Sequence, residues 1–417
     1  MVTYLASDEL QGRDTPSDGL EKAADFIAEG FRKVGLRPVP GADGFFQRAE
    51  FVEITPGVGA EVVLSAHGAS MALRPDSVRS SRAVELRDEA IYALPEKLPS
   101  TSLAGRVVAV VAGRFQSEES LDPIQALHPA AILMIGSRPV AREMVYLEKA
   151  AAQSSAVIRI VNDEALNALE DGVPLRVSMH IPEPRRRPVV LRNVVGILAG
   201  TGKETVIVSA HYDHVGMEAG QVFNGANDDA SGVASLIEIA GAMPGAPKRS
   251  IVFLAAFGEE KGLLGSQYYV EHPLVPLADT VAAINLEHLG RTDGYEGSKV
   301  AAFAFNGPSY SNLPGLVAEA ARSEHVSVYR KPDGDTYFER SDNYSFAKAG
   351  IVAHTAMVLF EFPGYHQLTD KADLLDYRNM QLVDRGLAAG IWALANRAEK
   401  PSWSNRPETA VFRQAHR

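Results

Sequence analysis

The sequence predicts an α/β protein with a mixed central sheet covered by helices on both faces, and a smaller, β-rich α/β domain inserted into it. Three observations support this fold class. Strand and helix patterns alternate along the chain after residue 190. Short apolar runs separated by turn residues dominate the stretch from about 50 to 185. The length of 417 residues also exceeds what one compact core usually supports, so two domains are expected.

The first elements define the domain boundaries. An amphipathic helix is expected over residues 17–35, because apolar side chains recur at helical spacing and Gly35 stands where a C-terminal cap belongs. The boundary stretch 181–188 holds three prolines and three arginines, and its run Arg185–Arg187 is interpreted as a solvated linker. We therefore predict a main domain of residues 1–54 and 186–400, an inserted domain of residues 55–185, and a C-terminal tail of residues 401–417.

The second part of the main domain supplies the remaining strands and helices. Apolar runs predict strands, and longer periodic segments predict helices. In open α/β sheets, functional sites gather beyond the C-terminal ends of the strands, so the residues that follow each strand are of special interest. The predicted strands are 205–210, 251–257, 281–286 and 351–360, and the predicted helices are 232–243, 313–324 and 379–397.

Composition excludes several classes of protein and site. The chain has 41 Lys and Arg against 52 Asp and Glu, a net charge of −11 that disfavours a general nucleic-acid-binding role. It has no cysteine, which excludes disulfides, thiolate metal sites and cysteine nucleophiles. No apolar run approaches the roughly 18 residues of a membrane span, and no signal-peptide pattern is visible at the start. Any metal site must be built from His, Asp and Glu.

Polar residues cluster where the predicted strands end. Each cluster alone has an ordinary explanation, such as a solvated loop or acidic residues at the start of a helix. Together they would crowd like charges into one cleft, where a divalent cation is the simplest compensation. Nitrogen and oxygen ligands without sulfur suit catalytic zinc, and a shared carboxylate would allow two ions. The clusters are His211-Tyr212-Asp213-His214, Asn227-Asp228-Asp229, Gly258-Glu259-Glu260, Glu287-His288 and Gly364-Tyr365-His366.

These motifs, in this order, resemble the co-catalytic zinc exopeptidases of metallopeptidase family 28, the group of bacterial leucyl aminopeptidases and aminopeptidase Y. The resemblance implies two Zn²⁺ ions, with Asp228 as the bridging ligand and Asp229 at a position often preceded by a cis peptide. It implies that Asp213 orients a ligand histidine and that Glu259 is the general base. Tyr365 is expected either to stabilise the oxyanion or simply to pack. The implied metal ligands are His211, Asp228, Glu260, Glu287 and His366.

The resemblance implies hydrolysis of the N-terminal peptide bond of peptides by a water that two zinc ions hold and Glu259 deprotonates. The segment Tyr4–Arg13 is similar to the family's opening segment, so an exported, trimmed protein is expected. The inserted domain is similar in position to a protease-associated domain. Two residues depart from the family pattern: Glu287 stands where many members carry Asp, and Asn343 replaces a common His that is not a ligand.

Three other functions stay open at this point. A glutaminyl-cyclase-like aminoacyltransferase shares the fold and uses one zinc. A carboxypeptidase of the glutamate carboxypeptidase type would act at the other end of a peptide. A metal-free binding ectodomain is a third possibility, although the full set of five ligands and Glu259 argues against it. Neither the preferred N-terminal residue nor the oligomeric state follows from the sequence.

Overall fold

A computed structural model describes residues 1–415 except 67, 96, 115–120, 139–145, 150–153 and 296. The chain divides into two compact units, one of Met1–Ala49 with Leu191–Arg417 and one of Glu50–Val190. The chain passes from one unit to the other along two strands, β2 (Phe46–Thr55) and β12 (Arg185–Leu198). The run Arg185–Arg187, interpreted above as a linker, is therefore the exposed beginning of a long strand.

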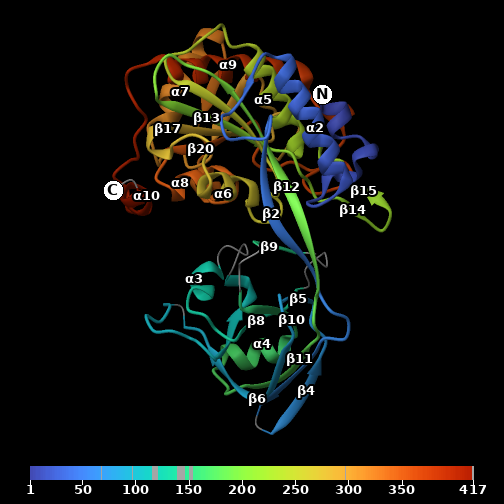
Figure 1. Ribbon diagram of the computed structural model, residues 1–417. Coiled ribbons are helices and arrows are strands. Elements are labelled where there is room, and N and C mark those ends of the chain that lie inside the picture. Colours follow the sequence, from blue (N-terminus) through green and yellow to red (C-terminus); the bar gives the residue numbers. More distant parts are fainter. Residues whose placement is uncertain are drawn as a thin grey trace. The chain divides into compact units, whose positions relative to one another are not determined.

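The first unit is built on a mixed sheet, in agreement with the predicted fold class (Figure 1). Its strands follow the order β19-β18-β20-β17-β13-β16-β12, continuing into β2. Strands β16, β13, β17 and β20 are parallel to one another, whereas β12 is antiparallel to β16 and β18 is antiparallel to β20. Strands β18 and β19 are parallel. The bounds are β1 Arg37–Pro38, β13 Thr205–His211, β14 Met217–Glu218, β15 Gln221–Val222, β16 Ser250–Ala256, β17 Thr280–Leu286, β18 Ala302–Phe305, β19 Ser327–Tyr329 and β20 Ala353–Met357.

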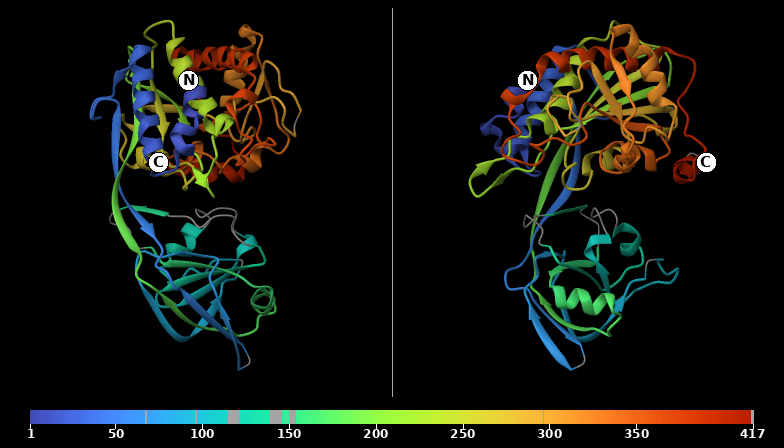
Figure 2. Two further views of the ribbon diagram at one scale, coloured as in Figure 1. Left: turned by 90° about the vertical axis from the view of Figure 1, so that its right-hand side faces the viewer. Right: turned by 180° about the vertical axis from the view of Figure 1, so that it is seen from behind.

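Helices cover both faces of this sheet (Figures 1 and 2). Helices α5 and α9 pack on β13 and on each other, and α2 and α7 pack on α5 and α9 respectively. Helices α6 and α8 cover the opposite face, on β16, β17 and β20. Ser17 caps α2 by accepting a hydrogen bond from the backbone of Leu20 at 3.0 Å. The bounds are α1 Val2–Leu5, α2 Asp18–Lys33, α5 Ser231–Gly241, α6 Leu264–Glu271, α7 Leu313–Ala321, α8 Asn343–Lys348, α9 Tyr377–Asn396 and α10 Ala410–Ala415.

Most predicted elements of this unit form close to their expected positions. The strand predicted over residues 351–360 is shorter, because only Ala353–Met357 pairs with its neighbours. The segment after residue 400 packs against this unit: the rings of Trp403 and Phe412 contact each other and the ring of Phe338. Burial of these aromatic rings explains why this segment lies against the unit. Residues 416–417 of the predicted tail lie outside the described residues.

The second unit has its own sheet and its own core. The strand order is β4-β3-β11-β6-β7-β8-β10-β5, with parallel pairing of β6, β7, β8 and β10 and antiparallel pairing elsewhere. Helix α4 packs on β7 and β8. The bounds are β3 Glu61–Ala66, β4 Ala69–Leu73, β5 Ser77–Arg79, β6 Val84–Ala93, β7 Val107–Val111, β8 Ala131–Gly136, β9 Tyr146–Lys149, β10 Ala156–Val161, β11 Arg176–Ile181, α3 Asp122–Gln125 and α4 Asp163–Glu170.

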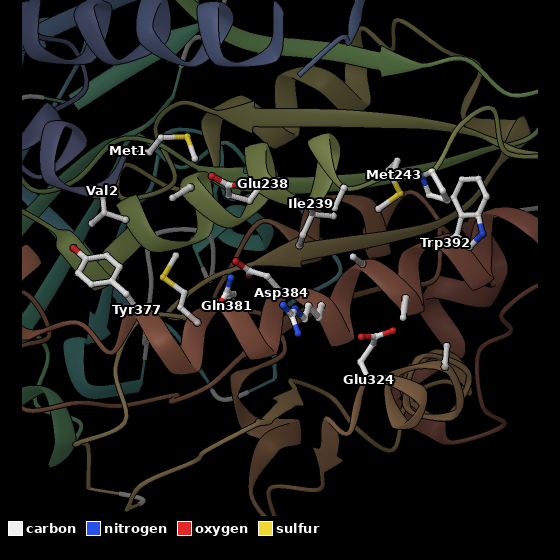
Figure 3. A pocket seen from close by; sticks show the side chains of 18 of the residues that line it. Met1, Val2, Glu238, Ile239, Met243, Glu324, Tyr377, Gln381, Asp384 and Trp392 are labelled. Carbon is white, nitrogen blue, oxygen red and sulfur yellow. The ribbon is translucent and has the colours of Figure 1, made fainter. Parts of the chain in front are cut away.

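A cavity of about 890 Å³ lies in the first unit between α5, α9 and the N-terminus (Figure 3). Its lining mixes apolar side chains such as Met243 and Trp392 with the acidic residues Glu238, Glu324 and Asp384. None of the polar clusters singled out from the sequence lines it. Among the described residues, no helix is both long enough and apolar enough to cross a membrane.

Candidate metal centre

Three parallel strands bring the first polar clusters to one edge of the sheet. Strand β13 ends at His211, β16 is followed by Glu259 and Glu260, and β17 is followed by Glu287. Because these strands are adjacent and parallel, their C-terminal ends meet at the same edge. The convergence therefore follows directly from the order of the strands.

Asp228 lies at the centre of the cluster. It belongs to the segment that precedes α5, and its side chain is almost fully buried. One carboxylate oxygen, Oδ1, is 3.2 Å from Nε2 of His211, and the other, Oδ2, is 3.2 Å from Nε2 of His366. The carboxylate thus stands between the two imidazoles. The peptide bond between Asp228 and Asp229 is cis, which agrees with the family resemblance.

Two groups of ligand atoms share Asp228. His214, Asp228, Glu260 and His366 form one group, and His211, Asp228 and Glu287 form the other; within each group the ligand atoms lie within 4.8 Å of one another. In the first group, Nε2 of His366 lies 3.1 Å from Oε1 of Glu260. The structure thus brings together all five residues that the resemblance implies as ligands, and adds His214.

Several of the buried ligand atoms make no hydrogen bond although they lie close together. Nε2 of His211 and Nε2 of His366 each lie about 3 Å from a carboxylate oxygen, yet neither makes a hydrogen bond with any described residue. Oδ2 of Asp228 is likewise buried without a hydrogen bond. Buried polar atoms that leave hydrogen bonds unmade are rare and costly unless an ion satisfies them. Nitrogen and oxygen donors in this arrangement fit zinc.

Charge coupling within the cluster is strong. Burial alone would raise the pKa of Asp228, but the surrounding histidines hold it well below its usual value. Burial would lower the pKa of His366, but the charges of Glu260 and Asp228 raise it to about 10. Burial raises the pKa of Glu259 well above its usual value, and the charges of Glu287 and Glu260 add to this effect against the opposing charge of His211. The cluster therefore holds excess negative charge that a cation would balance.

Asp213 and Glu259 surround the ligands without belonging to either group. Asp213 lies 3.6 Å from Nδ1 of His211, longer than an ordinary hydrogen bond. Its carboxylate accepts hydrogen bonds from the backbone N–H groups of Glu259 and Glu260, at 3.1 and 3.3 Å. In this structure Asp213 therefore holds the loop that carries both glutamates. The side chain of Glu259 lies beside the cluster and is half-buried.

Tyr365 and Asn343 occupy different surroundings. The ring of Tyr365 stacks on His366, with 4.0 Å between ring centroids, and its side chain is 37% exposed. Asn343 is buried; its side chain accepts hydrogen bonds from Asn306 and Thr355 and donates one to the backbone carbonyl of Phe338. The Asn at 343 therefore belongs to a buried network that holds the 338–343 loop.

Sequence reasoning did not assign roles to several residues that support the site. Asp370 accepts hydrogen bonds from the backbone N–H groups of Asn227 and Asp228, at 2.9 and 3.1 Å. The hydroxyl of Ser341 donates a hydrogen bond to Glu287. Arg13, fully buried, donates to the backbone carbonyls of Tyr212, Asn224 and Gly225. Only Arg13 carried a signal in the sequence, since it ends the opening segment Tyr4–Arg13.

A sheet edge where two groups of nitrogen and oxygen ligands share one aspartate defines a metal-binding α/β protein. The sequence assigns it to a particular family: residues 193–391 match the sequence profile of peptidase family M28, and this part of the chain belongs to that family. The resemblance proposed from the motifs is thus confirmed.

Individual relatives agree with this assignment. The chain is 28% identical over 279 residues to a probable zinc metalloprotease of Pyricularia oryzae, covering 54% of this chain and 52% of that protein. It is 27% identical over 222 residues to aminopeptidase YwaD of Bacillus subtilis, covering 50% of this chain and 46% of that protein. The matched part of the chain therefore spans about half the length of these relatives.

Solved structures confirm the fold. An aminopeptidase from Aneurinibacillus sp. strain AM-1 superposes with a TM-score of 0.65 at 18% identity, covering 96% of this chain and 94% of that one. A zinc aminopeptidase from Bacillus subtilis superposes with a TM-score of 0.55 at 20% identity, covering 95% and 94%. The predicted class, an α/β sheet with helices on both faces, is the class of these structures.

Proposed function

We propose that the protein is a zinc-dependent aminopeptidase that hydrolyses the N-terminal peptide bond of peptides and uses two zinc ions. The observation that carries this proposal is the position of Asp228, whose two oxygens face the imidazoles of His211 and His366. Membership of family M28 and the similarity to proteins named zinc metalloprotease and aminopeptidase support it. Export of the protein, and the similarity of its inserted domain to a protease-associated domain, stay predictions.

The residues divide into ligands and a proton carrier. Asp228 would bridge, Glu260 and His366 would hold one ion, and His211 and Glu287 the other. Bound zinc would polarise the scissile carbonyl and make a bound water more acidic. Glu259 would take a proton from the attacking water and pass it to the leaving amine. A carboxyl group whose pKa is raised by burial suits this task, because it holds a transferred proton more readily than an ordinary glutamate does.

The two groups of ligands also favour this function over a one-zinc cyclase. A second zinc would need its own ligands, and His211 and Glu287 supply them together with the shared Asp228. A carboxypeptidase would use the same metal chemistry on a different end of the peptide. The distinction between these functions is therefore one of substrate.

Activity with blocked and unblocked substrates tests the proposal. We expect zinc-dependent hydrolysis of an aminoacyl-nitroanilide and of dipeptides, inhibition by chelator, and no hydrolysis after acetylation of the amino terminus. Cyclisation of an N-terminal glutamine peptide with about one bound zinc per chain would instead indicate the cyclase. Release of a C-terminal glutamate from an acetylated peptide would indicate the carboxypeptidase.

Replacement of Glu259 tests the assigned base. Glu259→Gln should lower kcat by about 10²–10⁴-fold, the usual contribution of a general base, and should leave the zinc content unchanged. Glu319→Gln, an exposed change of the same type on α7, is the matched control. Wild-type kcat in the Glu259 variant would show that another group carries the proton.

A further inference from the structure

His214 lies in the metal centre but is not one of the proposed ligands. It follows β13 by three residues and is completely buried. Its backbone N–H donates to the carbonyl of Arg13 at 3.2 Å. Its ring packs against Gly225, where an added Cβ would lie 2.5 Å from the ring. Because both the backbone and the ring of His214 are held by these contacts, the fold fixes the position of its imidazole.

The Nδ1 atom of His214 faces the two carboxylates of the first group of ligands. It lies 3.0 Å from Oε1 of Glu260 and 3.7 Å from Oδ2 of Asp228. The ring of His366 approaches from the side, with 5.5 Å between the ring centroids and an angle of 77° between the rings. Two imidazoles and two carboxylates therefore surround one small volume.

The distances between these donor atoms match those of a tetrahedral zinc site. Bonds of about 2.0–2.1 Å in a tetrahedron place neighbouring ligand atoms about 3.3 Å apart. The two separations made by His366, to Asp228 and Glu260, are 3.2 and 3.1 Å. The two made by His214, at 3.0 and 3.7 Å, lie on either side of the same value. A single ion can therefore contact all four atoms.

We propose, on the basis of the proposed function, that Nδ1 of His214 is a fourth protein ligand of the ion held by Asp228, Glu260 and His366. The two ions then differ. One has four protein ligands, as structural zinc sites do, whereas the ion at His211, Asp228 and Glu287 has three and keeps an open position. The first ion binds tightly, and the second is the exchangeable one.

The competing role for His214 is a hydrogen bond from Nδ1 to Glu260, which would only orient that ligand. Two variants separate the roles. His214→Ala removes both the ligand and the donor. His214→Asn places an amide group near the position of Nδ1, so that it can still donate to Glu260 but is a poor zinc ligand. Glu287→Gln alters the other group of ligands and serves as the reciprocal control.

The experiment is a zinc titration of metal-free, full-length protein by calorimetry. Wild type should bind two zinc ions in a tight and a weaker step. Both His214 variants should weaken the tight step by more than about 100-fold, beyond the 10–100-fold loss typical of an orienting partner. Glu287→Gln should weaken mainly the other step. A tight step that is unchanged in either variant, or restored in His214→Asn, would overturn the proposal.

X-ray absorption of wild type loaded with one zinc provides a test that needs no variant. We expect two histidine nitrogens on the zinc, and a single one would overturn the proposal. Melting curves in excess chelator will show whether each variant folds as wild type does. Hydrolysis is measured in parallel. An inactive wild type that still shows the His214-dependent tight step would refute the proposed aminopeptidase activity but not the role of His214 as a ligand.

Discussion

Asp384 provides a stability prediction that is independent of the metal centre. It lies on α9 at the cavity between α5 and α9, close to Glu238 (Figure 3). Its side chain is half-buried, and Oδ1 makes no hydrogen bond with any described residue. Burial raises the pKa of Asp384 from 3.8 to about 7; the nearby hydroxyl of Ser235 opposes this change, and the charge of Glu238 adds to it. Folding therefore disfavours the ionised carboxylate.

The sign of the effect follows from proton binding. Between pH 3.8 and about 7 the native state keeps the proton on Asp384 and the unfolded state has lost it, so stability falls as pH rises. At 1.36 kcal/mol per pH unit the full difference is about 4 kcal/mol. Because the side chain faces a cavity open to solvent, we expect about 2–4 kcal/mol at pH 8. Asp384→Asn should recover this amount at pH 8 and much less at pH 4.5.

Denaturant unfolding followed by tryptophan fluorescence measures this effect in the compact unit that contains Asp384. Both tryptophans, Trp392 and Trp403, belong to the unit of residues 1–49 and 191–417. Excess chelator at both pH values removes any contribution from metal binding. Glu324→Gln is the matched control, because it removes an exposed negative charge at the same cavity. Equal stabilisation at the two pH values, or destabilisation at pH 8, would refute the reasoning.

Two further predictions concern the support of the site and its metal. Arg13→Met should lower the free energy of unfolding by about 3–5 kcal/mol and weaken zinc binding, because it leaves buried carbonyls of both ligand loops without a donor. Arg48→Met, an exposed change in the same unit, should cost at most about 1 kcal/mol. Equal losses of stability in the two variants would contradict the role given to Arg13. Removal of metal by chelator should lower the melting temperature and added zinc should restore it, since a ligand at 1,000 times its Kd stabilises by about 4.1 kcal/mol. In Asp228→Asn this difference should shrink, and a wild-type melting temperature that does not respond to chelator would argue against a bound metal.

The fold could be predicted largely from local patterns. Apolar strands and periodic helices after residue 190 form close to their expected positions, because each has a hydrophobic face that only one kind of element can bury. The run Arg185–Arg187 was misjudged for the converse reason. Its charge and flanking prolines are typical of a loop, but Arg185–Leu198 form one continuous strand that pairs with β16 over Val194–Leu198.

The sequence by itself indicated which residues could serve as ligands, because His211, Glu260 and Glu287 lie at or just after the ends of apolar strand patterns. In an open α/β sheet such positions gather at one edge. Only the tertiary structure decided the position of His214 relative to His366, and the backbone support that Asp370 and Arg13 give to the loops around Asp228. These contacts join segments far apart in the chain, across loops whose course depends on packing. No periodicity or spacing encodes such contacts, so they could not be predicted from the order of residues alone.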